Sequence, residues 1–322
     1  MMSDTAHQVR VIEGGCSWRT RAFGTWVRAR SGKPLRQDAD VLALRQRYEA
    51  IDAHHAVFAR GVQRDAVQLG SLAAERISVP ESRPERTLLY LHGGSFAYRL
   101  PNIHAAFAAR LCRRLGARAL IPDYRLAPEN PFPAAPDDCH AAYRWLLAQG
   151  CDPTGMTLVG DSAGANLALV TLLRARRAAE PLPACAVLLS PAVDCTMASQ
   201  SMVDNQGLDP MLRLGDLLVL RQHYVPSPSL YTDPEVSPLF ADFSGLPPLL
   251  LQTGSTELLR DDAVRMAQKA HAAGVKVELE LWPETPHAFQ VAPYLPESAR
   301  AIDHIADFVL ANTCWTDQHD PG

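Results

Sequence analysis

The sequence predicts an α/β fold in which a mainly parallel central sheet is flanked by helices. From about residue 76 onward, short apolar runs alternate with longer segments whose apolar residues recur at helical spacing. The apolar runs are rich in Leu, Val and Ile and do not alternate with polar residues, which is typical of strands covered on both faces. A repeated strand–helix order favours parallel pairing of the strands.

The individual elements can be assigned along the chain. Helical spacing dominates residues 1–75, where DADVLALRQRYEAIDAHHAVFARG opens at an Asp suited to capping and ends at Gly61. Beyond this segment, we expect strands at 86–91, 117–124, 156–161, 184–191, 248–254 and 276–283, with helices between them and a last helix near 297–312. Residues 196–245 interrupt the order with many turn-forming residues and one helical pattern at about 210–224. Since this is too long for an ordinary connection, we expect it to form a lid above the sheet with the N-terminal helices.

The composition is that of an ordinary globular protein of 322 residues, with 47% hydrophobic and 20% charged residues. A formal net charge of -4 argues against a nucleic-acid partner, which would favour a clustered basic face. The 7 cysteines form no CxxC pair, so neither a zinc site nor a disulfide framework is indicated, and a reducing compartment fits. We see no signal peptide and no apolar run near the ~18 residues of a membrane span. We therefore expect a cytoplasmic protein with no stable membrane association.

The segment LVGDSAGANLA, residues 158–168, contains a candidate nucleophile. It places Ser162 between Gly160 and Gly164, after a predicted strand and before a predicted helix. In a G-x-S-x-G turn of this kind, the glycines permit a tight, strained backbone that lifts the Ser hydroxyl out of the sheet. Ligands of parallel sheets bind beyond the carboxyl ends of the strands. The position of the motif, more than its pattern, therefore predicts that Ser162 is a nucleophile.

A serine nucleophile needs a base, and the base needs a carboxylate that orients it. His287 follows the last predicted strand, in the loop ETPHAF, and so lies at the same edge of the sheet. The preceding strand is followed by three candidate acids, Glu257, Asp261 and Asp262. Glu257 is nearest the strand end, whereas the two aspartates fall in the first turn of a helix, where carboxylates are common. We predict Glu257 as the acid, and Asp261 remains the alternative.

The segment LHGGSF follows the first strand of the series and predicts an oxyanion hole. Adjacent glycines let backbone N–H groups point into a pocket without interference from side chains. The predicted donors are the N–H groups of Gly93 and Gly94, with Ser95 as a further candidate, and that of Ala163 after the nucleophile. His92 is expected to brace this loop through a hydrogen bond.

The motifs, taken together, are similar to those of a known family. They are HGGSF (92–96), DYRLAPENPFPA (123–134), GDSAGANLA (160–168), SPAVDCT (190–196), SPLFADFSGLPPLLLQTGSTELLRDDA (237–263) and TPHAF (285–289). With them the chain resembles, from about residue 40 to its end, the hormone-sensitive-lipase-like α/β-hydrolases, the bacterial family IV esterases. The resemblance implies a catalytic domain over residues 76–322 and a helical cap made by residues 1–75 and an insertion at about 196–232.

The same resemblance implies a serine carboxylesterase for short- to medium-chain acyl esters, working through an acyl-enzyme without a metal or organic cofactor. Trp26, Phe96 and Tyr224 are candidate residues of the substrate pocket, and a homodimer through the last strand or helix is compatible with the family. Two departures stand out: Ser95 occupies the place of a third glycine, and the acid is Glu257 rather than Asp followed by Pro.

Other interpretations remain open. The same triad serves amidases, lactonases and acyltransferases, and the fold also supports ligand-binding proteins that do not catalyse. In DYRLAPE, we expect Asp123, Arg125 and Glu129 to form a polar network that holds the loop beside the site. Asp161 and Asn166 are expected to brace the turn at the nucleophile.

Overall fold

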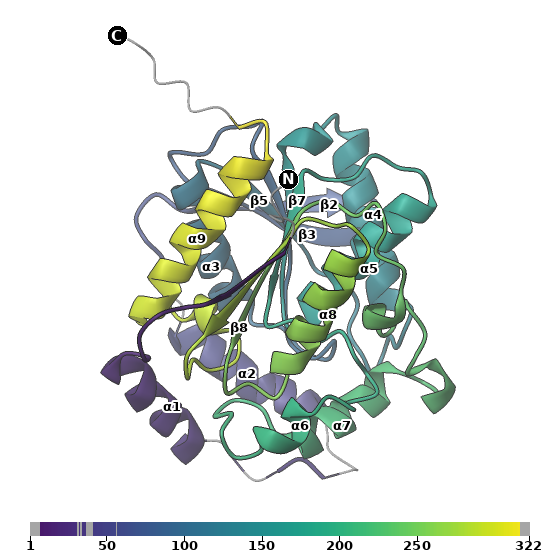
Figure 1. The fold of residues 1–322 in the computed structure, drawn as a ribbon. Helices are drawn as coiled ribbons and strands as arrows, with labels where there is room; N and C mark the ends of the chain where they lie inside the picture. Colours follow the sequence, from purple (N-terminus) through teal and green to yellow (C-terminus); the bar gives the residue numbers. More distant parts are fainter. Residues whose placement is uncertain (1–6, 31, 33, 37–40, 56, 316–322) are drawn as a thin grey trace, which may run out of the picture.

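The computed structural model describes residues 7–30, 32, 34–36, 41–55 and 57–315 (Figure 1). Among these residues, one nine-stranded sheet runs in the order β1-β9-β8-β7-β6-β4-β5-β3-β2. Its neighbouring strands are parallel except for the pairs β2–β3 and β3–β5. The strands are β1 (His7–Val11), β2 (Gln63–Leu69), β3 (Leu72–Ser78), β4 (Thr87–Leu91), β5 (Arg118–Pro122), β6 (Met156–Asp161), β7 (Cys185–Leu189), β8 (Leu249–Gly254) and β9 (Val277–Trp282). The predicted fold class is confirmed.

Helices cover both faces of this sheet. Figure 1 shows α3 and α9 on one side and α4, α5 and α8 on the other. The longer helices are α1 (Trp18–Arg30), α2 (Val41–His55), α3 (Pro101–Leu115), α4 (Ala134–Ala148), α5 (Ala163–Arg177), α7 (Leu214–Tyr224), α8 (Arg260–Ala272) and α9 (Pro296–Asn312). Within the described parts of the chain, no helix combines the length and apolarity that crossing a membrane requires.

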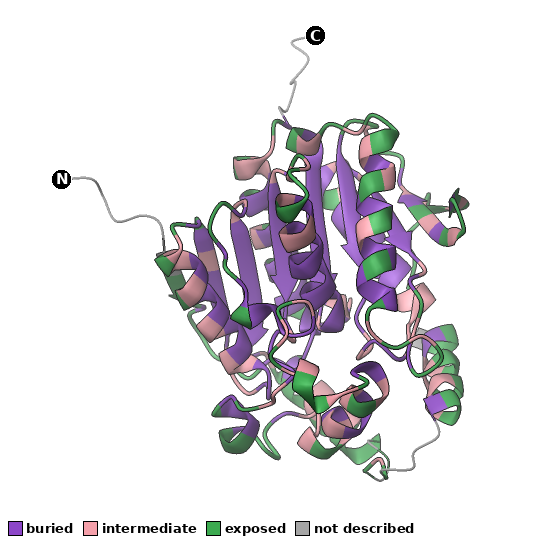
Figure 2. Ribbon diagram, turned by 90° about the vertical axis from the view of Figure 1, so that its right-hand side faces the viewer, coloured by how far each residue is buried: buried purple, intermediate pink, exposed green. Residues whose placement is uncertain are grey.

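The central strands owe their place to continuous apolar sequence. Every residue of β4, β6, β7 and β8 is buried, as Figure 2 shows for the interior of the sheet. A strand that is apolar on both faces must be covered on both faces, which the two helical layers accomplish. Helix α3 begins with Pro101 and is capped after Leu115 by Gly116, whose φ of 61° is suited to glycine.

The expectation that residues 1–75 are helical is wrong in part. Helices α1 and α2 are present, but β1, β2 and the first half of β3 also fall in this region, and β1 and β2 form the two edges of the sheet. β2 exposes one face and contains charged residues, so it lacks the apolar run by which the inner strands were recognised. Helix α2 ends at His55 rather than Gly61, and the Asp expected to cap it lies outside the described residues.

The segment that interrupts the strand–helix order contains two α-helices, α6 (Ser201–Asp204) and α7, and two short 3-10 helices, η2 (Pro228–Leu230) and η3 (Pro238–Phe240). Figure 1 shows the two α-helices at the end of the molecule where α1 and α2 also lie. The division into a cap and a catalytic domain remains a prediction.

The last strand in sequence, β9, is not an edge strand, because β1 and β8 pair with its two sides. Its backbone is therefore already paired on both sides in this structure, and the homodimer stays a prediction.

Candidate active site

Ser162 occupies a sharp turn between β6 and α5. Its backbone has φ 53° and ψ −119°, a conformation that non-glycine residues rarely adopt. A Cβ at Gly160 would lie 2.3 Å from the carbonyl oxygen of Gly164, and one at Gly164 would lie 1.9 Å from that of Leu91. The turn thus requires both glycines, for close approach of backbone to backbone.

Residues on either side of Ser162 brace the turn as predicted. Its own N–H donates to the carbonyl of Leu189 at 2.8 Å. The buried carboxylate of Asp161 accepts hydrogen bonds from the hydroxyl of Tyr90 at 2.6 Å and from the N–H of Gly93 at 2.9 Å. The side chain of Asn166 donates to two backbone carbonyls, at 2.8 and 3.0 Å. The turn is therefore held by the ends of β4, β6 and β7 at once.

His287 and Glu257 form a buried pair. The Nδ1 atom of His287 lies 2.8 Å from Oε2 of Glu257, and the two side chains are 7% and 0% exposed. Burial of the imidazole lowers its pKa, but the hydrogen bond and charge of Glu257 outweigh this, and the pKa of His287 is raised overall. The charges of Asp209 and Asp161 act in the same direction. With Nδ1–H donated to a carboxylate, the neutral imidazole presents Nε2 as a proton acceptor.

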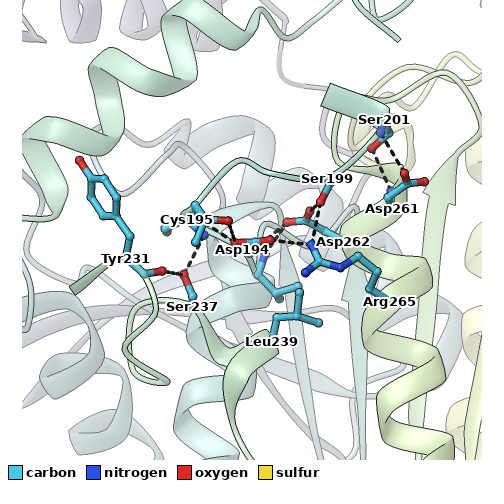
Figure 3. Close-up of polar contacts among 12 residues, drawn as sticks. Asp194, Cys195, Ser199, Ser201, Tyr231, Ser237, Leu239, Asp261, Asp262 and Arg265 are labelled. Carbon is cyan, nitrogen blue, oxygen red and sulfur yellow. Dashed lines mark hydrogen bonds and ion pairs between the residues drawn. The ribbon is translucent and has the colours of Figure 1, made fainter. Parts of the chain in front are cut away.

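The alternative acids are engaged elsewhere (Figure 3). Asp261 accepts hydrogen bonds from the N–H of Ser201 and the guanidinium of Arg260, at 2.9 and 2.8 Å. Asp262 accepts two backbone N–H groups and the hydroxyl of Ser199, and burial raises its pKa to about 7. Figure 3 shows both aspartates in a polar cluster at the start of the 196–245 segment. Of the three candidates, the structure brings Glu257 to His287.

Two groups of the 196–245 segment also reach the acid loop, and the sequence carried no signal for either. Asp209 is 6% exposed and accepts the N–H of Leu258 at 3.0 Å, while burial raises its own pKa. The amide of Asn205 donates to the carbonyl of Glu257 at 2.7 Å. The segment therefore forms hydrogen bonds with both polar groups of the peptide bond between Glu257 and Leu258.

The expectation for Gly93 needs correction, because its N–H already donates to Asp161 and is not available to an oxyanion in this conformation. A Cβ at Gly93 would lie 2.2 Å from Oδ2 of the same carboxylate. This glycine is therefore required for close packing of the loop against the turn of the nucleophile, a role that the spacing HGG alone does not distinguish from donation.

The donors that remain are the N–H groups of Gly94, Ser95 and Ala163. Within the described parts of the chain, none of the three has a recorded hydrogen-bond acceptor. Gly94 has φ 120°, and a Cβ there would lie 1.9 Å from the carbonyl oxygen of Tyr98. Ser95 follows with φ 52°. The substitution of Ser for a third glycine thus retains the backbone N–H group.

His92 braces the loop, as expected. The Nδ1 atom of His92 donates to the carbonyl of Gly93 at 2.7 Å, and the carbonyl of His92 accepts the hydroxyl of Tyr124 at 2.7 Å. The imidazole stacks between Tyr124 and His104, with ring centroids 4.2 and 5.2 Å away. Burial lowers the pKa of His92 to about 3, so it stays neutral and supports the loop without titrating.

The three aromatic candidates divide into a pair and a single residue. Phe96 and Tyr224 stack face to face with ring centroids 3.7 Å apart, and both are buried. Phe96 immediately follows the oxyanion loop and has φ 59°. Trp26 lies on α1, is 43% exposed, and stacks on Phe23 of its own helix. The structure joins Phe96 to Tyr224, and the place of all three in a substrate pocket stays a prediction.

The predicted network within DYRLAPE is wrong in its partners. Its three charged residues form separate ion pairs: Asp123 with Arg99, Arg125 with Asp138, and Glu129 with Arg45. Arg45 belongs to α2 and also donates to the carbonyls of Ala97 and Ala127. The loop is therefore tied to α2, to α4 and to Arg99 before α3, rather than to itself.

A pocket of about 370 Å³ is lined by residues of β2, β3 and β5 and of the segment that follows β4. Its lining includes His92, His104, Arg99 and Ala74, but not Ser162, Glu257 or His287. The Nε2 atom of His92 is fully buried, so the pocket does not reach it. Among the residues that the structure describes, no cluster of three or more His, Cys, Asp and Glu side chains is arranged to hold a metal ion.

Comparisons with known proteins identify the family of the chain. A family model described as alpha/beta hydrolase fold matches residues 88–291. An acetyl-hydrolase of Streptomyces hygroscopicus is 43% identical over 253 residues, which cover 77% of this chain and 83% of that protein. An esterase of Acinetobacter venetianus is 38% identical over 251 residues, covering 78% and 82%. The crystal structure of an esterase from the bacterial hormone-sensitive lipase family is 37% identical with a TM-score of 0.86, covering 93% of this chain and 99% of that one.

Proposed function

The chain belongs to the hormone-sensitive-lipase-like esterases of the α/β-hydrolase superfamily, and we propose that it is a serine carboxylesterase with Ser162 as its nucleophile. The observation that carries the proposal is the buried His287–Glu257 pair at 2.8 Å, at the same sheet edge as the strained turn of Ser162. A buried imidazole with its Nδ1–H donated to a carboxylate is suited to accept a proton at Nε2. This is the property that converts a Ser hydroxyl into a nucleophile.

The proposed mechanism has two halves. In the first, Nε2 of His287 takes the proton of Ser162 as the hydroxyl oxygen attacks the ester carbonyl carbon. The N–H groups of Gly94, Ser95 and Ala163 stabilise the negative oxygen of the tetrahedral intermediate. The imidazolium then protonates the leaving alcohol, and an acyl-enzyme remains. In the second half, a water molecule deprotonated by the same imidazole attacks the acyl group and releases the acid. All of these steps use groups of the protein.

We propose short- to medium-chain acyl esters as substrates. The Phe96–Tyr224 stack supports this, because Phe96 directly follows the oxyanion loop and pairs there with a second buried ring, so that bulky apolar groups lie beside the loop. One relative is named an acetyl-hydrolase, which is consistent with small acyl groups. A series of p-nitrophenyl esters from acetate to palmitate tests the assignment through kcat/KM. We expect the highest values among the shorter esters.

The nucleophile is tested directly by Ser162→Ala. The variant should lose hydrolysis of p-nitrophenyl acetate and covalent labelling by a fluorophosphonate probe, while Ser244→Ala, which removes an exposed hydroxyl, should keep both. Full activity in Ser162→Ala would contradict the proposal. Wild-type protein that is not labelled would favour a ligand-binding role. Product analysis with added alcohol or amine acceptors separates hydrolysis from acyl transfer, and amide and lactone substrates test the other chemistries.

We also propose that α1 and α2, the helical part of residues 1–75, act with the insertion at about 196–232 as the cap of this site. The contacts of Asp209 and Asn205 with the acid loop, and of Arg45 with the oxyanion loop, support this division. Such a cap would couple substrate entry to the loops that carry the catalytic groups. A homodimer is also proposed from the family, by a surface other than the edge of β9.

A further inference from the structure

Ser190, the residue directly after β7, lies at a strand end that contacts the loops of all three residues of the proposed triad. The residue before it, Leu189, accepts the backbone N–H of Ser162 through its carbonyl at 2.8 Å. The hydroxyl of Ser190 donates to Oε1 of Glu257 at 2.8 Å. The same hydroxyl accepts the N–H of Ala288, the neighbour of His287, at 3.1 Å. One strand end therefore contacts the nucleophile's turn, the acid and the loop of the base.

The hydroxyl of Ser190 is fully committed to these two contacts. A serine hydroxyl has a single proton to donate, and here the proton goes to Glu257 while an oxygen lone pair takes the N–H of Ala288. The residue is 0% exposed, so water does not compete for either position. Both hydrogen bonds together restrict the rotation of the hydroxyl and hold the two loops at a set separation.

The backbone at Ser190 is strained. Its φ is 46°, a value that favours glycine, and its N–H donates to the carbonyl of Gln252 at 2.7 Å. A residue in this conformation costs stability and persists where its surroundings hold it. A glycine would relieve the strain but would lack the hydroxyl that reaches Glu257. The side chain, rather than the turn, thus accounts for a serine at this position.

We propose that Ser190 is a positioning residue for the proposed reaction, acting through Glu257, and the inference rests on the proposed function. Together with the N–H of Gly254, which donates to Oε1 at 2.5 Å, Ser190 holds that oxygen and leaves Oε2 to face Nδ1 of His287. The second hydrogen bond of Ser190, from the N–H of Ala288, holds the backbone beside His287 to the same hydroxyl. Without the hydroxyl, the carboxylate of Glu257 and the backbone beside His287 no longer share a hydrogen-bonding partner.

The first experiment compares Ser190→Ala with Ser237→Ala. Ser237 is a matched control, since its buried hydroxyl also donates to one group and accepts from a backbone N–H (Figure 3). Its partners are the carbonyl of Tyr231 and the N–H of Cys195, and neither belongs to the triad or its loops. Kinetics are measured per active site titrated with a fluorophosphonate. We expect Ser190→Ala to lower kcat by about 10- to 100-fold, as for loss of a hydrogen bond to a charged group, with KM changed by less than about twofold. Ser237→Ala should lose stability but keep kcat per titrated site.

A double-mutant cycle then separates positioning from a general structural effect. In a Glu257→Gln background, Ser190→Ala should lower kcat by less than about twofold, because its effect passes through the carboxylate already removed. Ser190→Cys keeps a weak donor of similar shape, and its kcat should fall between those of wild type and Ser190→Ala. The cysteine variant also provides the test if the alanine variant folds poorly. An undiminished kcat in Ser190→Ala, or an equal loss in both backgrounds, would overturn the inference. A wild-type protein that is not labelled would instead overturn the proposed function.

Discussion

Replacing Glu257 by Gln keeps the shape of the acid side chain and removes its charge. The structure determines how the new amide would orient. Oε1 of Glu257 accepts from Ser190 and from the N–H of Gly254, so the amide oxygen must take that position. The amide NH₂ then occupies the position of Oε2, 2.8 Å from Nδ1 of His287. Since NH₂ donates, Nδ1 must accept, and the proton of the neutral imidazole moves to Nε2.

An imidazole in that tautomer cannot take the proton of Ser162. Loss of the correct tautomer in serine hydrolases of this kind lowers kcat by about 10⁴-fold, or about 5.5 kcal/mol of transition-state stabilisation. We therefore expect Glu257→Gln to lower kcat for p-nitrophenyl acetate by about 10³- to 10⁴-fold, with little change in KM. The measurement is steady-state kinetics, with thermal unfolding to verify that the variant is folded.

Asp261→Asn is the matched control, because Asp261 is the other carboxylate that the sequence offered as the acid. Its contacts are with Ser201 and Arg260, so its loss should change kcat by less than about tenfold, through packing of the segment alone. A Glu257→Gln variant that keeps more than a tenth of wild-type kcat, or an Asp261→Asn variant that loses more than Glu257→Gln, would refute the assignment of the acid.

Two further predictions concern pH and the turn of the nucleophile. Because His287 acts as a base in its neutral form and Glu257 raises its pKa, kcat/KM should fall as pH drops, with a midpoint above the ordinary value of about 6.5. In Glu257→Gln, burial lowers the pKa of His287 without the opposing effect of the carboxylate, so the midpoint should move to lower pH. An unchanged midpoint would contradict the pairing of His287 with Glu257. Gly164→Ala would place a Cβ 1.9 Å from the carbonyl of Leu91 and should lower the free energy of unfolding in urea by at least about 3 kcal/mol. Gly215→Ala, in a helix with open space around it, should be neutral or stabilising, and equal effects of the two changes would argue against the close approach.

The inner part of the fold and the candidate triad could be predicted from the sequence because one rule connects them. Parallel strands buried on both faces appear as continuous apolar runs, and functional groups follow their carboxyl ends. Ser162, Glu257 and His287 each come within a few residues of such a run. The choice of Glu257 over Asp261 followed from its distance to the strand end, and the contact with His287 supports it.

Other features could not be predicted, since they depend on contacts rather than on local pattern. β1 and β2 are edge strands with exposed or charged faces, so hydrophobic periodicity does not distinguish them from loops or helices. Gly93 and Gly94 are adjacent and chemically identical in the sequence. Only the approach of Asp161 shows that the N–H of Gly93 is occupied.

The backbone conformation offers a route to the site that does not depend on the motifs. Strained φ values persist where the surroundings over-determine them, and they gather at functional sites. Of the eight non-glycine residues with positive φ in the described parts of the chain, seven fall in loops that directly follow the carboxyl ends of β4, β6, β7 and β9: Ser95, Phe96, Ser162, Ser190, Met197, Glu284 and Ala288. Two of these, Ser190 and Ala288, form the hydrogen bond that links the acid's support to the loop of the base. The strain thus marks Ser190 together with the nucleophile, although no sequence motif assigned it a role.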